Sequence, residues 1–171
     1  GIATTQDLTK VADADIICLC LPDNSVVKDI ILSEDKLYPH LHKGQIIIDF
    51  STISFRVAQD IAKTLEDTKG VEFLDAPISG RKKRADDGTL TIMCGGKREL
   101  FDRMKPYLDY MGKDILYMGT SGSGQLAKSF NGTLFKLNIA GFCELLPLAT
   151  KMGLDPLMME RIINTGVAES D

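Results

Sequence analysis

The sequence predicts an α/β protein, and two observations carry this prediction. Short apolar runs alternate along much of the chain with segments whose apolar side chains recur every three or four residues. This alternation is typical of a parallel sheet covered by helices. With 171 residues, the chain is long enough for about one domain with a substantial hydrophobic core.

Five apolar runs are predicted to be strands. The first is apolar on both faces, which indicates a strand that is covered on both sides and has neighbours at both edges. The polar turns that follow the first two runs lead directly into predicted helices. The five predicted strands are residues 15–21, 45–50, 71–75, 90–94 and 114–117.

The segments between these runs are predicted to be helices. Apolar side chains repeat at helical spacing in residues 26–31, 57–65 and 100–108. Pro106 lies inside the last of these segments, and we expect it to kink or end that helix because proline lacks an N–H donor.

The pattern changes after residue 120. Residues 122–152 hold no strand signal and predict one long helix, which Pro147 is expected to bend. Gly153 supplies a C-terminal stop, and Asp155 followed by Pro156 predicts the cap and the first residue of another helix.

This change predicts two domains. Residues 1–120 are expected to form a partial dinucleotide-binding domain, and residues 121–171 a connecting helix with the beginning of an all-helical domain. A sheet of this type normally opens with a strand and a glycine-rich turn that holds a pyrophosphate. The sequence contains no G-x-G-x-x-G. We therefore expect the chain to be a piece of a longer protein, lacking about 30 residues at the front, the size of one βαβ unit.

Composition argues against several classes of function. The formal net charge of −4 offers no basic excess for nucleic acid or an anionic membrane, and no apolar run is long enough to span a bilayer. No C-x-x-C pair occurs, and Cys18 and Cys20 fall in an apolar run where we expect buried thiols. The spacing of His40 and His42 does not suit a zinc site. These features predict a cytoplasmic protein without a metal, disulfides, a nucleic-acid partner or a membrane partner.

Four motifs occur in order along the chain. They are CLPD (20–23), DFSTI (49–53), DAPISG (75–80) and GSGQLAKSFN (122–131). They resemble the strand-end LP turn, the D-x-S-T-I, the D-A-P-V-S-G and the G-x-G-x-x-x-K-x-x-N of the β-hydroxyacid dehydrogenase family, which includes 3-hydroxyisobutyrate dehydrogenase and is related to 6-phosphogluconate dehydrogenase. The resemblance covers essentially the whole chain. It implies a Rossmann-like dinucleotide-binding domain, followed by an interdomain helix and the start of an all-α domain.

The resemblance also implies a role for each motif. Lys128 is expected to be the catalytic general acid/base and Asn131 an orienting residue. Ser79 and Gly80 are expected to hold the carboxylate of a small β-hydroxy acid. The cofactor is expected to be NADP or NAD, with NADP preferred, and the assembly a homodimer or larger homo-oligomer. The residues expected to contact the cofactor are Leu21, Pro22, Ser51 and Thr52.

The chemistry of Lys128 can be argued independently. Lys128 and Asn131, at positions i and i+3, share one face of the predicted helix. A carbonyl that accepts a hydride develops alkoxide charge, and a lysine can stabilise this charge and supply the proton. Burial can bring a lysine pKa toward neutrality. The alternative is a non-catalytic cofactor-binding scaffold of the same family, against which the presence of Lys128 argues.

Two positions depart from the family pattern. Arg81 stands where many members have a second glycine, and it begins a run of four cations that ends at Arg84. This run is interpreted either as a site for a second anionic group of the substrate, which would make Arg81 a substrate-binding residue, or as a solvated basic loop. Gly132 stands where relatives often carry an asparagine, so either Asn131 acts alone or the activity is reduced.

Overall fold

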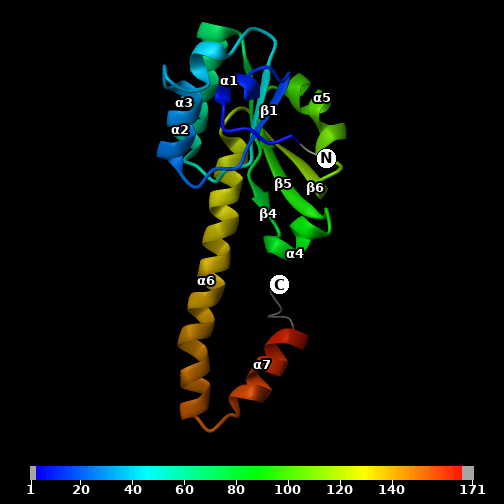
Figure 1. The fold of residues 1–171 in the computed structure, drawn as a ribbon. Coiled ribbons are helices and arrows are strands. Elements are labelled where there is room, and N and C mark those ends of the chain that lie inside the picture. Colours follow the sequence, from blue (N-terminus) through cyan, green and yellow to red (C-terminus); the bar gives the residue numbers. More distant parts are fainter. Residues whose placement is uncertain (1–2, 167–171) are drawn as a thin grey trace. The chain divides into compact units, whose positions relative to one another are not determined.

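The computed structural model describes residues 3–166, which form two compact units, one up to Lys128 and one from Ser129 onward (Figure 1). The domain boundary predicted between residues 120 and 121 stays a prediction, and the ends of both predicted domains, residues 1–2 and 167–171, lie outside the described residues. The strands are β1 (Ile16–Leu19), β2 (Ile46–Asp49), β3 (Glu72–Asp75), β4 (Ile78–Ser79), β5 (Leu90–Gly95) and β6 (Gly112–Gly119). The helices are α1 (Leu8–Val11), α2 (Asn24–Leu32), the short 3-10 turn η1 (Tyr38–His40), α3 (Phe55–Lys69), α4 (Arg81–Asp86), α5 (Arg98–Leu108), α6 (Ser123–Lys151) and α7 (Pro156–Thr165).

The strands form one sheet in the order β1-β2-β3-β5-β4, with β6 paired to β5. The pairs β1–β2, β2–β3 and β5–β6 are parallel, while β5 runs antiparallel to β3 and β4. The predicted α/β class is confirmed, but the sheet is mixed. The physical reason is that the chain continues from β3 through Ala76 and Pro77 into β4, and β5 returns alongside this stretch without a crossover helix.

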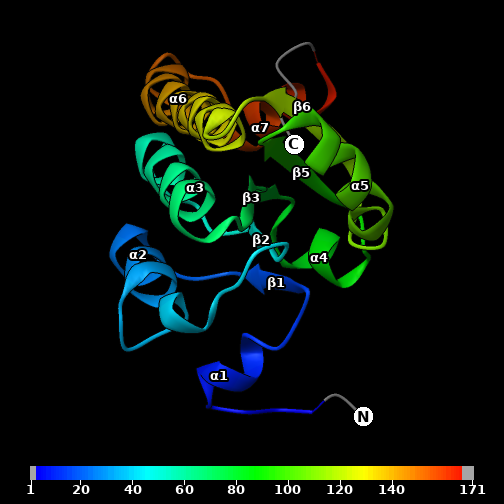
Figure 2. The same cartoon turned by 90° about the horizontal axis from the view of Figure 1, so that it is seen from above.

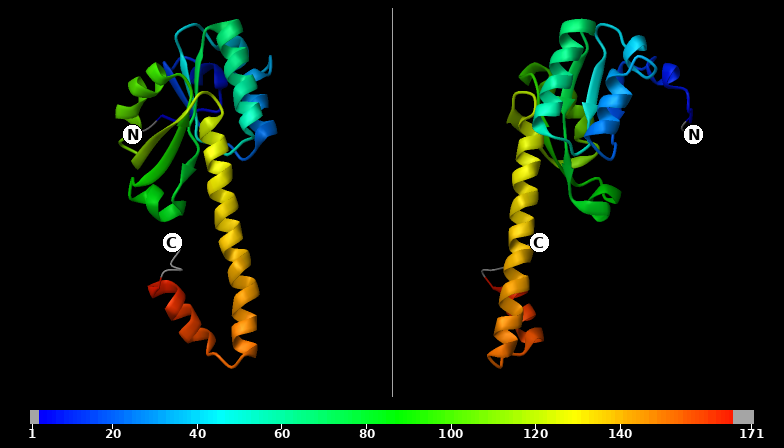
Figure 3. Two further views of the ribbon diagram at one scale, coloured as in Figure 1. Left: turned by 180° about the vertical axis from the view of Figure 1, so that it is seen from behind. Right: turned by 90° about the vertical axis from the view of Figure 1, so that its left-hand side faces the viewer.

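Helices cover both faces of the sheet (Figure 2). On one face, α2 and α3 lie side by side (Figure 3), and their buried side chains, among them Ile31, Ile61 and Leu65, pack on Ile47 and Phe73 of the sheet. On the other face, α5 buries Leu100, Phe101, Met104 and Leu108 against the opposite set of strand residues, including Ile48, Leu74 and Ile92. The two-residue alternation along each strand thus divides the core into two clusters.

The first strand lies at one edge of the sheet that the structure describes. Among the described residues, β1 pairs with β2 alone, so it is an edge strand, and Cys18 is exposed instead of covered by a helix. Cys20, just beyond the strand, is exposed as well, whereas Cys94 on β5 is buried. The expectation of two buried thiols in this run was therefore wrong, because an apolar run does not show whether both of its faces are covered.

The predicted helices are present, and α1, η1 and α4 are additional. The basic run from Arg81 to Arg84 forms α4 and not a loop. Pro106 lies inside α5, which ends two residues later, and α6 continues through Pro147. In the second unit, Asp155 caps α7 by accepting a hydrogen bond from the Leu157 N–H, as predicted. Within residues 3–166 no helix is long and apolar enough to cross a membrane.

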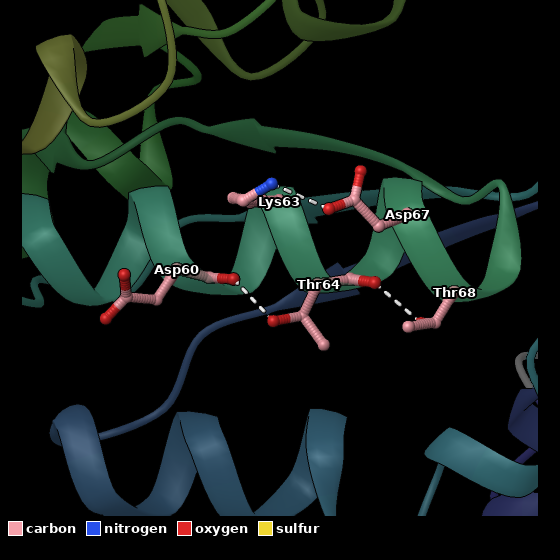
Figure 4. Close-up of polar contacts among 5 residues, drawn as sticks. All are labelled: Asp60, Lys63, Thr64, Asp67 and Thr68. Carbon is pink, nitrogen blue, oxygen red and sulfur yellow. Dashed lines mark hydrogen bonds and ion pairs between the residues drawn. The ribbon is translucent and has the colours of Figure 1, made fainter.

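The solvent-facing side of α3 is held by local polar contacts (Figure 4). Lys63 forms an ion pair of 2.7 Å with Asp67, one turn later. The Thr64 and Thr68 hydroxyls donate to the carbonyl oxygens of Asp60 and Thr64, each four residues earlier. The helix then ends at Gly70, whose φ of 64° is in the left-handed region that glycine adopts readily.

These two sides of α3 predict contrasting mutational effects. Leu65 is 0% exposed in the core, so Leu65→Ala should lower the free energy of unfolding by about 2–5 kcal/mol through loss of burial and creation of a cavity. Lys63→Ala, which removes only an exposed ion pair, should lower it by less than about 1 kcal/mol. Urea unfolding followed by circular dichroism measures both values, and equal losses would contradict the assigned orientation of α3.

Candidate functional site

The three parallel strands β1, β2 and β3 end in register. Asp49 of β2 pairs with Leu19 of β1 on one side and with Asp75 of β3 on the other, so the loops that follow these residues leave from one edge of the sheet. Ligands of open α/β sheets bind outside the carboxyl ends of the strands. This edge therefore carries the first three motifs of the sequence.

Ser51 joins two of these loops. Its Oγ accepts a hydrogen bond of 2.8 Å from the Leu21 N–H, while its own N–H donates to Asp49 Oδ1 at 2.9 Å. Ser51 is buried, whereas Pro22 and Thr52 are exposed. Of the four residues predicted to contact a cofactor, Leu21 and Ser51 bond to each other, and Pro22 and Thr52 face solvent.

Asp49 is a fully buried carboxyl at the end of β2. Burial raises its pKa, and the hydrogen bonds from Ser51 oppose this rise only in part. Its Oδ2 atom has no hydrogen-bond partner among the described residues. A buried oxygen without a donor favours the protonated acid.

Ser79, Gly80 and Arg81 form the connection from β4 to α4. Ser79 pairs with Thr91 of β5, and Gly80 has a φ of 140°, with no room for a Cβ because the Arg84 side chain lies 2.6 Å from its ideal position. Within residues 3–166, Arg81 is the one non-glycine residue with a positive φ, 56°. An L-residue in this region carries about 1–2 kcal/mol of strain.

Lys128 lies near the start of α6 and is half-buried. Desolvation lowers the pKa of its amine, because burial disfavours the charged form. Asn131 follows three residues later in the same helix and is exposed. The predicted spacing on one helix is confirmed, and the catalytic roles of both residues stay predictions.

Two buried residues at this site had no role in the sequence analysis. Both Oδ atoms of Asp75 accept hydrogen bonds from the start of α6, from the Gly122 N–H at 2.7 Å and the Gln125 N–H at 3.1 Å. The Gln125 side chain donates to the Ser51 carbonyl oxygen at 2.7 Å and accepts from the Ile53 N–H at 3.0 Å. The available signal was a carboxylate at a strand end, which suits the unpaired N–H groups of a helix start.

The described residues contain no group of three or more His, Cys, Asp or Glu side chains that could hold a metal ion. This edge presents backbone N–H groups, hydroxyls and the buried carboxyls of Asp49 and Asp75. Pro22 and Thr52 are exposed at this carboxyl edge, and their contact with a cofactor stays a prediction.

Two family models together match nearly the whole chain. Residues 1–119 match the NAD-binding domain of 6-phosphogluconate dehydrogenase. Residues 122–171 match the NAD-binding domain of NADP-dependent 3-hydroxyisobutyrate dehydrogenase.

Individual relatives agree with these matches. The chain is 35% identical to 2-(hydroxymethyl)glutarate dehydrogenase of Eubacterium barkeri, covering 99% of this chain and 56% of that protein. It is 34% identical to 2-hydroxy-3-oxopropionate reductase of Escherichia coli, covering 99% and 57%. Among solved structures, 3-hydroxyisobutyrate dehydrogenase of Mycobacterium tuberculosis, described with L-serine, aligns with a TM-score of 0.87 at 31% identity, covering 99% of this chain and 57% of that one.

The chain thus spans just over half the length of these relatives. The four motifs, the strand-end loops and α6 with Lys128 all fall inside the matched residues. On these matches, the chain belongs to the β-hydroxyacid dehydrogenase family and contains an NAD-binding domain of the 6-phosphogluconate dehydrogenase type.

Proposed function

We propose that the protein is an NAD(P)-dependent oxidoreductase that interconverts a small β-hydroxy acid and its semialdehyde or ketone. The observation that carries this proposal is the half-buried amine of Lys128, with its lowered pKa, on a helix whose start is bonded to the strand ends of a dinucleotide-binding fold. Relatives named as dehydrogenases and reductases of hydroxy acids support the same substrate class.

Each site residue has a proposed part in the reaction. When bound, the cofactor supplies or accepts the hydride. Lys128 donates a proton to the substrate oxygen during reduction and removes the hydroxyl proton during oxidation. Asn131 orients the substrate, and Ser79 with the backbone of Gly80 binds its carboxylate. Leu21, Pro22, Ser51 and Thr52 hold the cofactor, which we propose is NADP because the model that matches residues 122–171 describes an NADP-dependent enzyme.

The location and the assembly are part of the same proposal. We assign the protein to the cytoplasm and to a homodimer or larger homo-oligomer, as the sequence analysis predicts. The proposed role of Lys128 depends neither on the location nor on the oligomeric state.

We further propose that the substrate carries a second anionic group, which Arg81 binds. The strained φ of Arg81, directly after Gly80, supports this role, because strained backbone positions cluster at functional sites. The relative from Eubacterium barkeri is named for a glutarate, which is a dicarboxylate.

Lys128→Ala tests the proposed reaction. The assay uses the full-length protein, whose intact mass is measured first, with NAD⁺ or NADP⁺ and a panel of 3-hydroxy acids. Loss of the general base should lower kcat by about 10²–10⁴-fold while cofactor binding is retained. In the wild type, the oxidation rate should rise with pH and level off below the ordinary lysine value of 10.5, since the neutral amine is the base and its pKa is lowered.

Lys136→Ala is the matched control, because Lys136 is an exposed lysine of the same helix to which no role is assigned. Its kcat should equal that of the wild type. Cofactor binding without turnover, unchanged by Lys128→Ala, would instead identify a scaffold.

Arg81→Gly tests the second anionic group. The variant should lose about tenfold or more in kcat/KM on dianionic substrates, since a hydrogen bond to a charged group contributes about 1.5–3 kcal/mol, and much less on monoanionic ones. Lys113→Ala, at an exposed position on β6, controls for the general loss of a positive charge. Equal losses on both substrate classes would reject the proposal.

A further inference from the structure

The first turn of α6 is bonded to the sheet through one carboxylate. The first N–H groups of a helix have no partner within the helix. Here Asp75 accepts from the N–H groups of Gly122, Gly124 and Gln125, while the Ser123 N–H bonds to the Thr120 carbonyl oxygen. The helix start is therefore fully paired, and one side chain from the end of β3 provides most of the acceptors.

The Asp75 carboxylate is closely packed between β5 and the start of α6. A Cβ added at Gly95, the cross-strand partner of Asp75, would lie 2.7 Å from both Asp75 Oδ atoms and 2.7 Å from the Gly124 nitrogen. A Cβ at Gly124 would meet the Met93 carbonyl oxygen and would lie 2.8 Å from Asp75 Oδ2. The two glycines allow β3, β5 and α6 to approach closely enough for the carboxylate to reach three N–H groups.

A second contact fixes the rotation of the same turn. Gln125 is fully buried, and its amide bonds to Ser51 and Ile53 in the loop after β2. Asp75 and Gln125 together join the first turn of α6 to two strand ends. Lys128 follows Gln125 by three residues, so the placement of its amine depends on the placement of this turn.

We infer that Asp75 is a positioning residue for Lys128: through the N–H groups of Gly122, Gly124 and Gln125 it holds the start of α6 in the orientation that proton transfer by Lys128 requires. This inference rests on the proposed function. Asp75 touches neither substrate nor cofactor in this role, and it acts through the helix alone.

The contact depends on the ionisation of Asp75. Burial raises its pKa to about 6, against the hydrogen bonds that lower it. Two titratable groups adjoin it, Cys94 on β5, whose pKa is raised to about 12, and Asp49 on β2, which is also buried. The α6 side presents backbone N–H groups. Below about pH 6, the added proton weakens the bonds from these N–H groups, which favour the charged carboxylate, so the contact between Asp75 and the helix start weakens as the pH falls.

The test measures the reduction direction in the full-length protein, because Lys128 then acts in its charged form and acid does not disable it. In the wild type, kcat should fall below about pH 6 as Asp75 takes up its proton. Asp75→Asn replaces one acceptor oxygen with a donor and should lower kcat by about 10–100-fold, the cost of an error of about 1 Å in a catalytic group, with the KM for the cofactor unchanged. In Asp75→Asn, the fall of kcat below about pH 6, which is the acid limb of the pH profile, should disappear.

Two further variants complete the comparison. Asp75→Ser keeps one acceptor oxygen that suits a helix start, cannot titrate and covers the case in which Asp75→Asn does not fold. It should retain more activity than Asp75→Asn and also lack the acid limb. Asp7→Asn is the matched control, because Asp7 is an exposed aspartate that caps α1 through the Thr9 N–H. Its profile should match that of the wild type.

A readout independent of turnover is the NMR titration of the Lys128 side chain, assigned with Lys128→Arg. If Asp75 holds the helix start, Lys128 should become more solvated in both Asp75 variants, and its lowered pKa should return toward 10.5. An unchanged Lys128 pKa together with wild-type kcat and a retained acid limb would overturn the inference while leaving the proposed reaction intact. Absence of turnover in the wild type, or full turnover in Lys128→Ala, would reject the proposed function, and the inference would fall with it.

Discussion

The contact between the Asp75 carboxylate and the start of α6 is the interaction on which the arrangement of the site depends. It joins the end of β3 to the helix that carries Lys128, and the buried Gln125 amide extends the link to the loop after β2. Ser51 in that loop accepts from the Leu21 N–H after β1. One chain of hydrogen bonds therefore connects three strand ends with one helix. Removing a buried member leaves its partners unpaired, which is more costly than the loss of an exposed contact.

The sequence predicts the elements well where their signals are local. Helical periodicity and the Asp155-Pro156 start give α2, α3, α6 and α7 to within a few residues. The antiparallel return of β5 was not predictable, because pairing direction depends on where β4 and the short helix α4 lead the chain. The exposure of Cys18 follows from tertiary coverage, which a run of apolar residues does not encode.

The motifs indicated the candidate site, and the structure adds contacts of their residues that the motifs did not suggest. The motifs indicated Ser51 as a cofactor contact, and the structure shows its hydroxyl accepting a backbone N–H and its carbonyl oxygen bound by Gln125. They included Asp75 and the two glycines of G-x-G without a reason for either. For Asp75 and Gly124 the reason is the close approach of β3, β5 and α6, which are distant in sequence. Gly122 has a φ of 87°, and a Cβ there would lie 2.7 Å from the Phe55 carbonyl oxygen of α3.

Because Gln125 is held in place, the number of helical residues after it fixes the position of Lys128. An α-helix advances about 1.5 Å and rotates about 100° per residue, so one residue inserted or deleted between Gln125 and Lys128 would swing the amine around the helix by more than a quarter turn. The exposed residues 34–35 and 42–44, between α2 and β2, have no such constraint, because exposed turns can absorb a change of length. Variation in length among descendants of this chain should therefore accumulate in such surface turns and be absent between Gln125 and Lys128.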